Sequence, residues 1–85
     1  MRNEFDEISV SQARELSKEE LVKIGNKLKE LRVKHGLTLN DVAFFLYSNI
    51  STVERLERGK LENLTLLTLM KFVLFYKITV KDLFM

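Results

Sequence analysis

The stretch Leu37–Lys60, LTLNDVAFFLYSNISTVERLERGK, decides the fold that we predict for this 85-residue chain. Thr38 and Asp41 form a helix start signal, a hydroxyl residue followed three positions later by an acid, just before an apolar run. The next apolar residues recur at helical spacing and predict one buried stripe: Val42, Ala43 and Leu46. We therefore predict a short helix over residues 39–46.

A second short helix, over residues 50–58, is predicted after a tight turn. Asn49 is a favourable N-cap, and Val53 and Leu56 form the inward pair of this helix. Gly59 supplies the left-handed residue that ends it. The small side chain of Ala43 lets the two helices cross. Together they predict a helix-turn-helix, the commonest unit for placing a helix in the DNA major groove.

The segment before this unit divides at residue 17. Residues 1–16 place Phe5, Ile8 and Val10 among acids and serines, and they fit a short strand, an irregular arm or a helical extension. Ser17-Lys18-Glu19-Glu20 is a capping box that predicts the start of a helix. Apolar residues at steps of three and four form one face of that helix, before Gly36 ends it: Leu21, Ile24, Leu28 and Leu31.

The segment after the unit predicts two more helices. Thr65 can cap a helix that runs to about Tyr76, and Thr79 with Asp82 caps a final short helix. We therefore expect an all-α chain with five short helices around one core.

Composition agrees with one small helical domain. The chain has no proline and only three glycines, which suits a bundle with short connections. It has no cysteine, which excludes a disulfide framework and a thiolate metal site. No stretch is long and apolar enough to span a bilayer, so we expect a soluble cytoplasmic protein. The formal net charge of +2 is compatible with a nucleic-acid partner without being diagnostic.

The run from Ile24 to Phe84 resembles the Cro/CI-type (XRE-like) helix-turn-helix repressor family. The residues that carry this resemblance are Ile24, Gly25, Leu28, Leu31, Arg32, Gly36, Leu37, Thr38, Asp41, Val42, Ala43, Leu46, Ser51, Thr52, Val53, Arg55, Leu56, Glu57, Arg58, Gly59, Lys60, Leu66, Leu69, Asp82, Leu83 and Phe84. The resemblance implies a lambda-repressor-like DNA-binding domain, which we assign to residues 17–85, after an N-terminal extension over residues 1–16. It implies a transcription regulator, a repressor that reads a palindromic operator.

Similarity to this family points to Ile50, Ser51 and Arg55 as base-contacting residues. The fork of Arg55 fits guanine, Ser51 can donate to or accept from several base edges, and Ile50 can pack on a thymine methyl. Phosphate contacts are expected from helix N-termini and flanking basic residues. These candidates are Thr38, Asn40, Asn49, Thr52, Arg58 and Lys60.

The resemblance also implies a partly buried ion pair between Arg32 and Glu57, which would tie the first helix to the end of the recognition helix. Three positions depart from the family. Leu39 stands where Gln is usual, and Tyr47 stands where Gly is common, so Tyr47 is expected at positive φ. The loop after Gly59 lacks the usual Pro. These departures fit an altered operator mode or a surface that serves a protein.

Apolar residues exceed what one small core requires. In the helix before Tyr76 we expect a core face of Leu66, Leu69, Phe72, Val73 and Tyr76. The remaining apolar residues form a candidate dimer or partner surface: Phe44, Phe45, Leu67, Leu74, Phe75, Val80 and Met85. Either the N-terminal segment or a second copy of the chain could cover them, and we expect a homodimer.

These observations favour a sequence-specific DNA-binding repressor with double-stranded DNA as its partner. The alternative is a protein-interaction module of the same fold, an antitoxin or a repressor antagonist. We expect no enzyme, cofactor or metal, because the lone His35 has no clustered acids and no Gly-rich phosphate loop is present.

Overall fold

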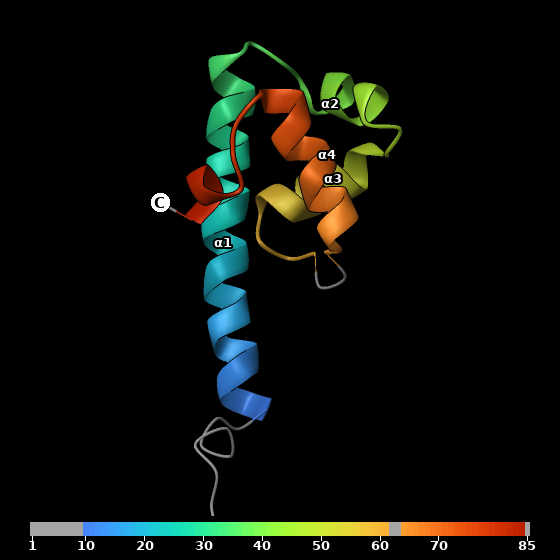
Figure 1. Cartoon of the computed structure of the whole chain (residues 1–85). Helices are drawn as coiled ribbons and strands as arrows, with labels where there is room; N and C mark the ends of the chain where they lie inside the picture. The colour runs from blue at the N-terminus through green and yellow to red at the C-terminus, as the bar shows by residue number, and fades with distance from the viewer. Residues whose placement is uncertain (1–9, 62–63, 85) are drawn as a thin grey trace, which may run out of the picture.

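The structure, a computed structural model, describes the backbone of residues 10–61 and 64–84 and the side chains from residue 17 onward in those ranges. Four α-helices follow one another along these residues: α1 (Val10–Lys34), α2 (Leu39–Phe45), α3 (Ile50–Glu57) and α4 (Leu66–Tyr76). A short 3-10 helix, η2 (Lys81–Phe84), ends the described chain (Figure 1). The described residues contain no strand, so the all-α prediction is confirmed.

Helix α1 begins seven residues before the expected start. It runs without interruption from Val10, so the predicted helix start at Ser17 was wrong and the capping box there is helix interior. A serine inside a helix costs only a few tenths of a kcal/mol, so a start signal in the sequence does not force a start. Of the three alternatives for the N-terminal segment, a helical extension holds for residues 10–16. Phe5 and Ile8 lie outside the described residues.

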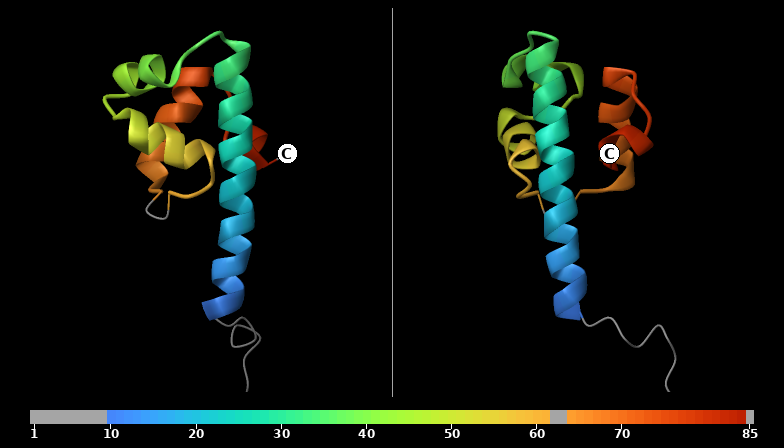
Figure 2. Two further views of the ribbon diagram at one scale, coloured as in Figure 1. Left: turned by 180° about the vertical axis from the view of Figure 1, so that it is seen from behind. Right: turned by 90° about the vertical axis from the view of Figure 1, so that its left-hand side faces the viewer.

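The other helices are arranged along the sides of the long helix α1 (Figure 1). Viewed along the direction of Figure 2, right, α2 and α3 lie on one side of α1 and α4 lies on the other. The N-terminal turns of α1 extend beyond the rest of the body (Figure 1). No helix in the described ranges is both long and apolar enough to cross a membrane.

The core forms between α1, α2, α3, α4 and η2. Its buried apolar residues come from every element: Ile24, Leu28, Leu31, Val42, Ala43, Leu46, Val53, Leu56, Leu69, Phe72, Val73, Tyr76 and Leu83. Two predicted core positions differ. Leu21 is only half-buried, and Leu66 is exposed because it is the first residue of α4, where the chain has just turned out of the loop.

Three of the predicted caps are present. Thr38 caps α2, Asn49 caps α3 and Thr65 caps α4, each accepting from a backbone N–H of the first turn. Thr79 and Asp82 also bond reciprocally, with 2.8 Å from Thr79 N to the Asp82 carboxylate. The segment that they open is the 3-10 helix η2 and not a fifth α-helix.

Candidate nucleic-acid interface

The start of α2 is fixed by a reciprocal capping box. The hydroxyl of Thr38 accepts from the Asp41 N–H at 3.0 Å, and the Asp41 carboxylate accepts from the Thr38 N–H at 2.9 Å. These two hydrogen bonds favour the charged carboxylate and lower the pKa of Asp41. Asn40, beside them, is exposed. Thr38 therefore serves the fold first, and a phosphate contact would be an additional role.

The turn between α2 and α3 is tight and uses a left-handed residue. Tyr47 has φ of 53°, which confirms the expected positive φ. The Ser48 N–H donates to the Ala43 carbonyl at 2.8 Å, and the Tyr47 N–H donates to the Phe44 carbonyl at 3.3 Å. These bonds satisfy carbonyls at the end of α2 and reverse the chain within a few residues.

The N-terminal end of α3 is capped and exposed. The Asn49 side-chain oxygen accepts from the Thr52 N–H at 2.8 Å. Ile50 is 44% exposed, and Asn49 and Ser51 are exposed as well. Thr52 is half-buried and its N–H is used by the cap. The tip of α3 is thus open to a partner, with the first amide groups of the helix free of intrahelical bonds.

The two faces of α3 differ sharply. Val53 and Leu56 are fully buried, while Ser51 and Arg55 are exposed. Since the buried pair anchors the helix, the exposed residues project from a fixed support. All three predicted base-contacting residues are therefore accessible: Ile50 and Ser51 in the first turn of α3, and Arg55 in its last turn.

The basic residues near the end of α3 differ in their surroundings. Arg58 pairs with Glu54 at 3.4 Å, with both side chains at least half exposed. Such an exposed pair is weak and is readily exchanged for a phosphate. Lys60 is exposed on the loop that follows.

An ion pair joins α1 to the end of α3. Arg32 Nε donates to Glu57 Oε2 at 2.8 Å, and Arg32 Nη2 donates to Glu57 Oε1 at 3.1 Å. Arg32 Nη1 donates to the Leu37 carbonyl at 2.9 Å. The pair implied by the family resemblance is present. The hydrogen bond to Glu57 raises the pKa of Arg32. One guanidinium thus joins α1, α3 and the loop that leads to α2.

Two glycines let α1 approach the end of α3, and sequence reasoning did not assign them this role. A Cβ on Gly25 would lie 2.6 Å from the Glu57 carbonyl oxygen, closer than real Cβ contacts. Gly59 has φ of 71°, and a Cβ there would lie 2.8 Å from the Cα of Val22. A glycine inside an amphipathic helical pattern was the available signal for Gly25.

Tyr76 lies in the core as predicted, but the sequence did not reveal the contacts of its ring or the state of its hydroxyl. Its ring stacks on His35 with centroids 5.9 Å apart, and it is buried in the core. Its hydroxyl makes no hydrogen bond among the described residues. Burial raises the pKa of Tyr76 to about 12, and the charge of Glu57 adds to this, while Arg32 opposes it.

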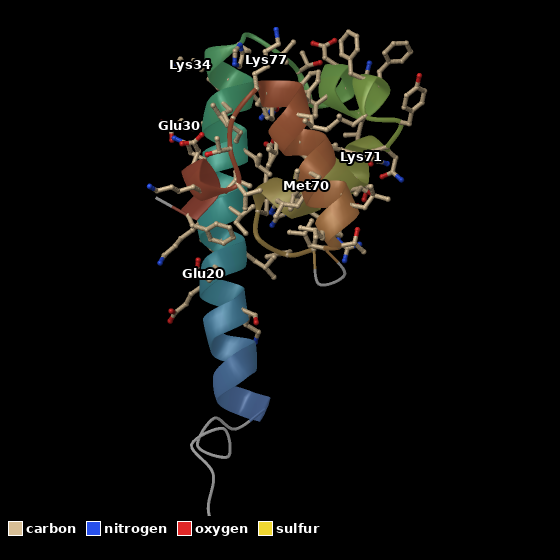
Figure 3. The ribbon with its side chains drawn as sticks, in the orientation of Figure 1. Glu20, Glu30, Lys34, Met70, Lys71 and Lys77 are labelled. Carbon is tan, nitrogen blue, oxygen red and sulfur yellow. The ribbon has the colours of Figure 1, made fainter. Side chains whose placement is uncertain are left out.

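The candidate partner surface separates into two parts. On α2, Phe44 is 76% exposed and packs edge-on against Phe45, which stacks on the half-buried Phe75. On α4, Leu67 and Leu74 are exposed. Figure 3 shows Met70 and Lys71 on the same helix. Val80 is exposed near η2, and Met85 lies outside the described residues.

Metal-type side chains do not gather in the described part of the chain: it holds no group of three or more His, Cys, Asp or Glu residues placed to bind an ion. The polar features of that part of the chain are instead caps, exposed ion pairs, the Arg32–Glu57 pair and the exposed end of α3.

Comparison with known proteins agrees with this geometry. Residues 28–83 match the helix-turn-helix family, and the chain belongs to this family, in its XRE-type branch. A solved structure that it resembles is the restriction-modification controller protein C.AhdI from Aeromonas hydrophila, with 35% sequence identity and a TM-score of 0.67. The match covers 74% of this chain and 94% of that protein. A search of curated proteins gave no match. The family and this neighbour support a DNA-binding transcription regulator.

Proposed function

We propose that this helix-turn-helix protein is a transcription regulator that inserts the N-terminal end of α3 into the DNA major groove. One observation carries the proposal: Ser51 and Arg55 are exposed on the helix whose other side, Val53 and Leu56, is fully buried. A recognition helix needs this combination, because base edges are read only by side chains held on a rigid support.

Each residue of this surface has a defined task in the proposal. Arg55 donates to guanine O6 and N7, a contact worth about 1–3 kcal/mol of discrimination when it is bidentate. Ser51 and Ile50 contact neighbouring base edges. Thr38, Asn40, Asn49, Thr52, Arg58 and Lys60 supply the phosphate contacts around them.

We further propose that the protein acts as a homodimer on a palindromic operator and represses by covering a promoter. The exposed Leu67 and Leu74 and the half-buried Met70 recur at steps of three and four on α4, the spacing at which one helix covers another. A two-fold axis between two copies would present two α3 helices to half-sites about one DNA turn, or ~34 Å, apart. The neighbour's role as a restriction-modification controller makes regulation of such a gene cluster the first setting to examine. A DNA target implies a cytoplasmic location.

Selection of bound sequences from random duplexes tests the proposal. The purified full chain should enrich an inverted repeat, and its affinity should fall steeply with salt. Arg55→Ala should relax preference at one base pair of each half-site. Lys60→Ala should weaken all sequences alike and reduce the slope of log affinity against log salt by about 0.9 for each protomer. A chain that binds no duplex above background at low salt would contradict the proposal.

The second candidate is a protein-interaction module of the same fold, an antitoxin or a repressor antagonist. The exposed Phe44 and Phe45 favour it, because an apolar partner could cover both side chains and neither is among the proposed DNA contacts. Absence of duplex binding, together with a partner that protects Phe44 from solvent, would support this candidate.

A further inference from the structure

Tyr47 occupies a conformation and an environment that the isolated fold does not explain. Its φ of 53° lies in the left-handed region, which glycine adopts freely and bulky residues rarely do. Its side chain is 96% exposed. In the described part of the chain it makes no side-chain hydrogen bond, ion pair or ring contact. The fold therefore bears the strain of Tyr47 and receives no packing from its ring in return.

The turn holds this ring at the edge of the proposed DNA-reading surface. Tyr47 lies two residues before the Asn49 cap, and the exposed Ile50 and Ser51 follow that cap. The backbone on either side is pinned by the bonds from Tyr47 N–H and Ser48 N–H to carbonyls of α2. The ring is therefore attached to a fixed turn three residues before the first residue of α3, and in the proposed complex a sugar-phosphate strand would border that end of the helix.

We propose that Tyr47 is a DNA backbone contact, whose hydroxyl donates to a phosphate oxygen at the rim of the major groove while its ring packs on the adjacent sugar. Tyrosine is among the side chains that contact phosphates without reading sequence. This inference rests on the proposed function, and it names a residue for which the sequence suggested only a strained turn. Tyr47 would act as a positioning residue that sets how far α3 enters the groove.

The test compares three variants of the full chain on the duplex enriched by the wild type: Tyr47→Gly, Tyr47→Phe and Tyr47→Ala. Tyr47→Gly relieves the backbone strain, so it should unfold at a temperature equal to or above that of the wild type. Tyr47→Phe should bind the duplex about tenfold more weakly, since it loses a hydrogen bond to a charged acceptor. Tyr47→Gly and Tyr47→Ala should lose at least as much, because they lose the ring as well. The loss should be the same for operator and unrelated duplexes. The slope of log affinity against log salt should stay unchanged, because a neutral hydroxyl releases no counterion, in contrast to Lys60→Ala.

The outcomes separate this inference from the function beneath it. A wild-type chain that binds no duplex overturns both. A wild type that binds, with all three variants equal to it, overturns the role of Tyr47 alone, and so does self-association weakened by Tyr47→Gly without loss of DNA affinity. Wild-type affinity in Tyr47→Phe alone overturns the hydroxyl contact. A melting temperature of Tyr47→Gly well below that of the wild type overturns the claim that the fold gains nothing from the ring.

Discussion

Replacing Arg32 by methionine should show how much stability depends on the Arg32–Glu57 ion pair. Among the described residues it is the one ion pair that is buried. The side chains of Arg32 and Glu57 are only 14% and 5% exposed, so they form a buried ion pair. Exposed pairs contribute about 0.2–1 kcal/mol. Removing one partner of a buried pair costs about 3–5 kcal/mol, because the other charge stays in the interior uncompensated. We expect the larger loss for Arg32→Met, since the Glu57 carboxylate would lose both of its hydrogen bonds to Arg32, at 2.8 and 3.1 Å.

This loss should lower the melting temperature by roughly 12 °C or more for a domain of this size. Urea unfolding followed by circular dichroism gives the free energy of unfolding, and an unchanged m-value shows that the denatured state is not the cause. The double variant Arg32→Met with Glu57→Met removes both charges, and we expect it within about 1–2 kcal/mol of the wild type, since only the bond to Leu37 and some packing are lost. The cycle should thus give a coupling energy of about 2 kcal/mol or more.

The matched control is the exposed pair of Lys23 and Glu20, whose atoms are 3.4 Å apart and whose side chains are 64% and 46% exposed. Glu20→Gln should change stability by less than about 0.5 kcal/mol. A loss for Arg32→Met no larger than that of this control would show that the Arg32–Glu57 pair behaves as an exposed one. So would a double variant whose loss equals the sum of the losses in the single variants Arg32→Met and Glu57→Met, because the two charges would then not be coupled.

Three more outcomes follow from the structure. Gly25→Ala should lower the free energy of unfolding by about 1–3 kcal/mol despite the better helix propensity of Ala, since the added Cβ meets the backbone of α3. The control Gly36→Ala has open space for its Cβ and should lose only about 1–2 kcal/mol, the cost of a left-handed Ala. A Gly25→Ala variant more stable than the wild type in urea unfolding would contradict this. The pKa values of Asp41 and Asp82 are lowered in the folded chain, so the stabilisation from these carboxylates is present above the ordinary pKa of 3.8 and is lost as pH falls below it. The melting temperature should therefore drop below that pH. The variants Asp41→Asn and Asp82→Asn should show a smaller drop. Leu74→Glu should convert the proposed dimer to a monomer, measured by sedimentation at micromolar concentration. Because Leu74 is 72% exposed, the melting temperature should shift by less than about 4 °C. A dimer that is unchanged would show that α4 is not in the interface.

Local signals predicted the caps and turns well. The Thr38 and Asp41 box and the Asn49 cap were both readable, since each is decided by residues within a few positions of one another. The positive φ of Tyr47 was expected from the family resemblance, because Gly is common at this position. The Arg32 and Glu57 pair was found through the family resemblance, and 25 positions separate the two residues. No local pattern could have paired them.

The misses arose where tertiary context decides. Ser17 carries a start signal, but the helix continues through it from Val10 because a serine in the interior costs little. Leu66 fits the apolar period of α4 and is still exposed. The close approach at Gly25 depends on the crossing of two helices distant in sequence, so the sequence showed an unexplained glycine and the structure supplied its reason. The base and phosphate assignments stay predictions until DNA binding is measured.

The chain has two tyrosines and no tryptophan, and the two rings sit in opposite surroundings. Tyr47 is almost wholly in solvent, while Tyr76 is 6% exposed. Ultraviolet emission from this protein therefore comes from one ring that a dissolved quencher such as iodide can reach and one that it cannot. A quenching titration of one unlabelled sample would report two things. Protection of Tyr47 from the quencher would show that a partner covers the turn, and continued protection of Tyr76 would show that the core stays folded.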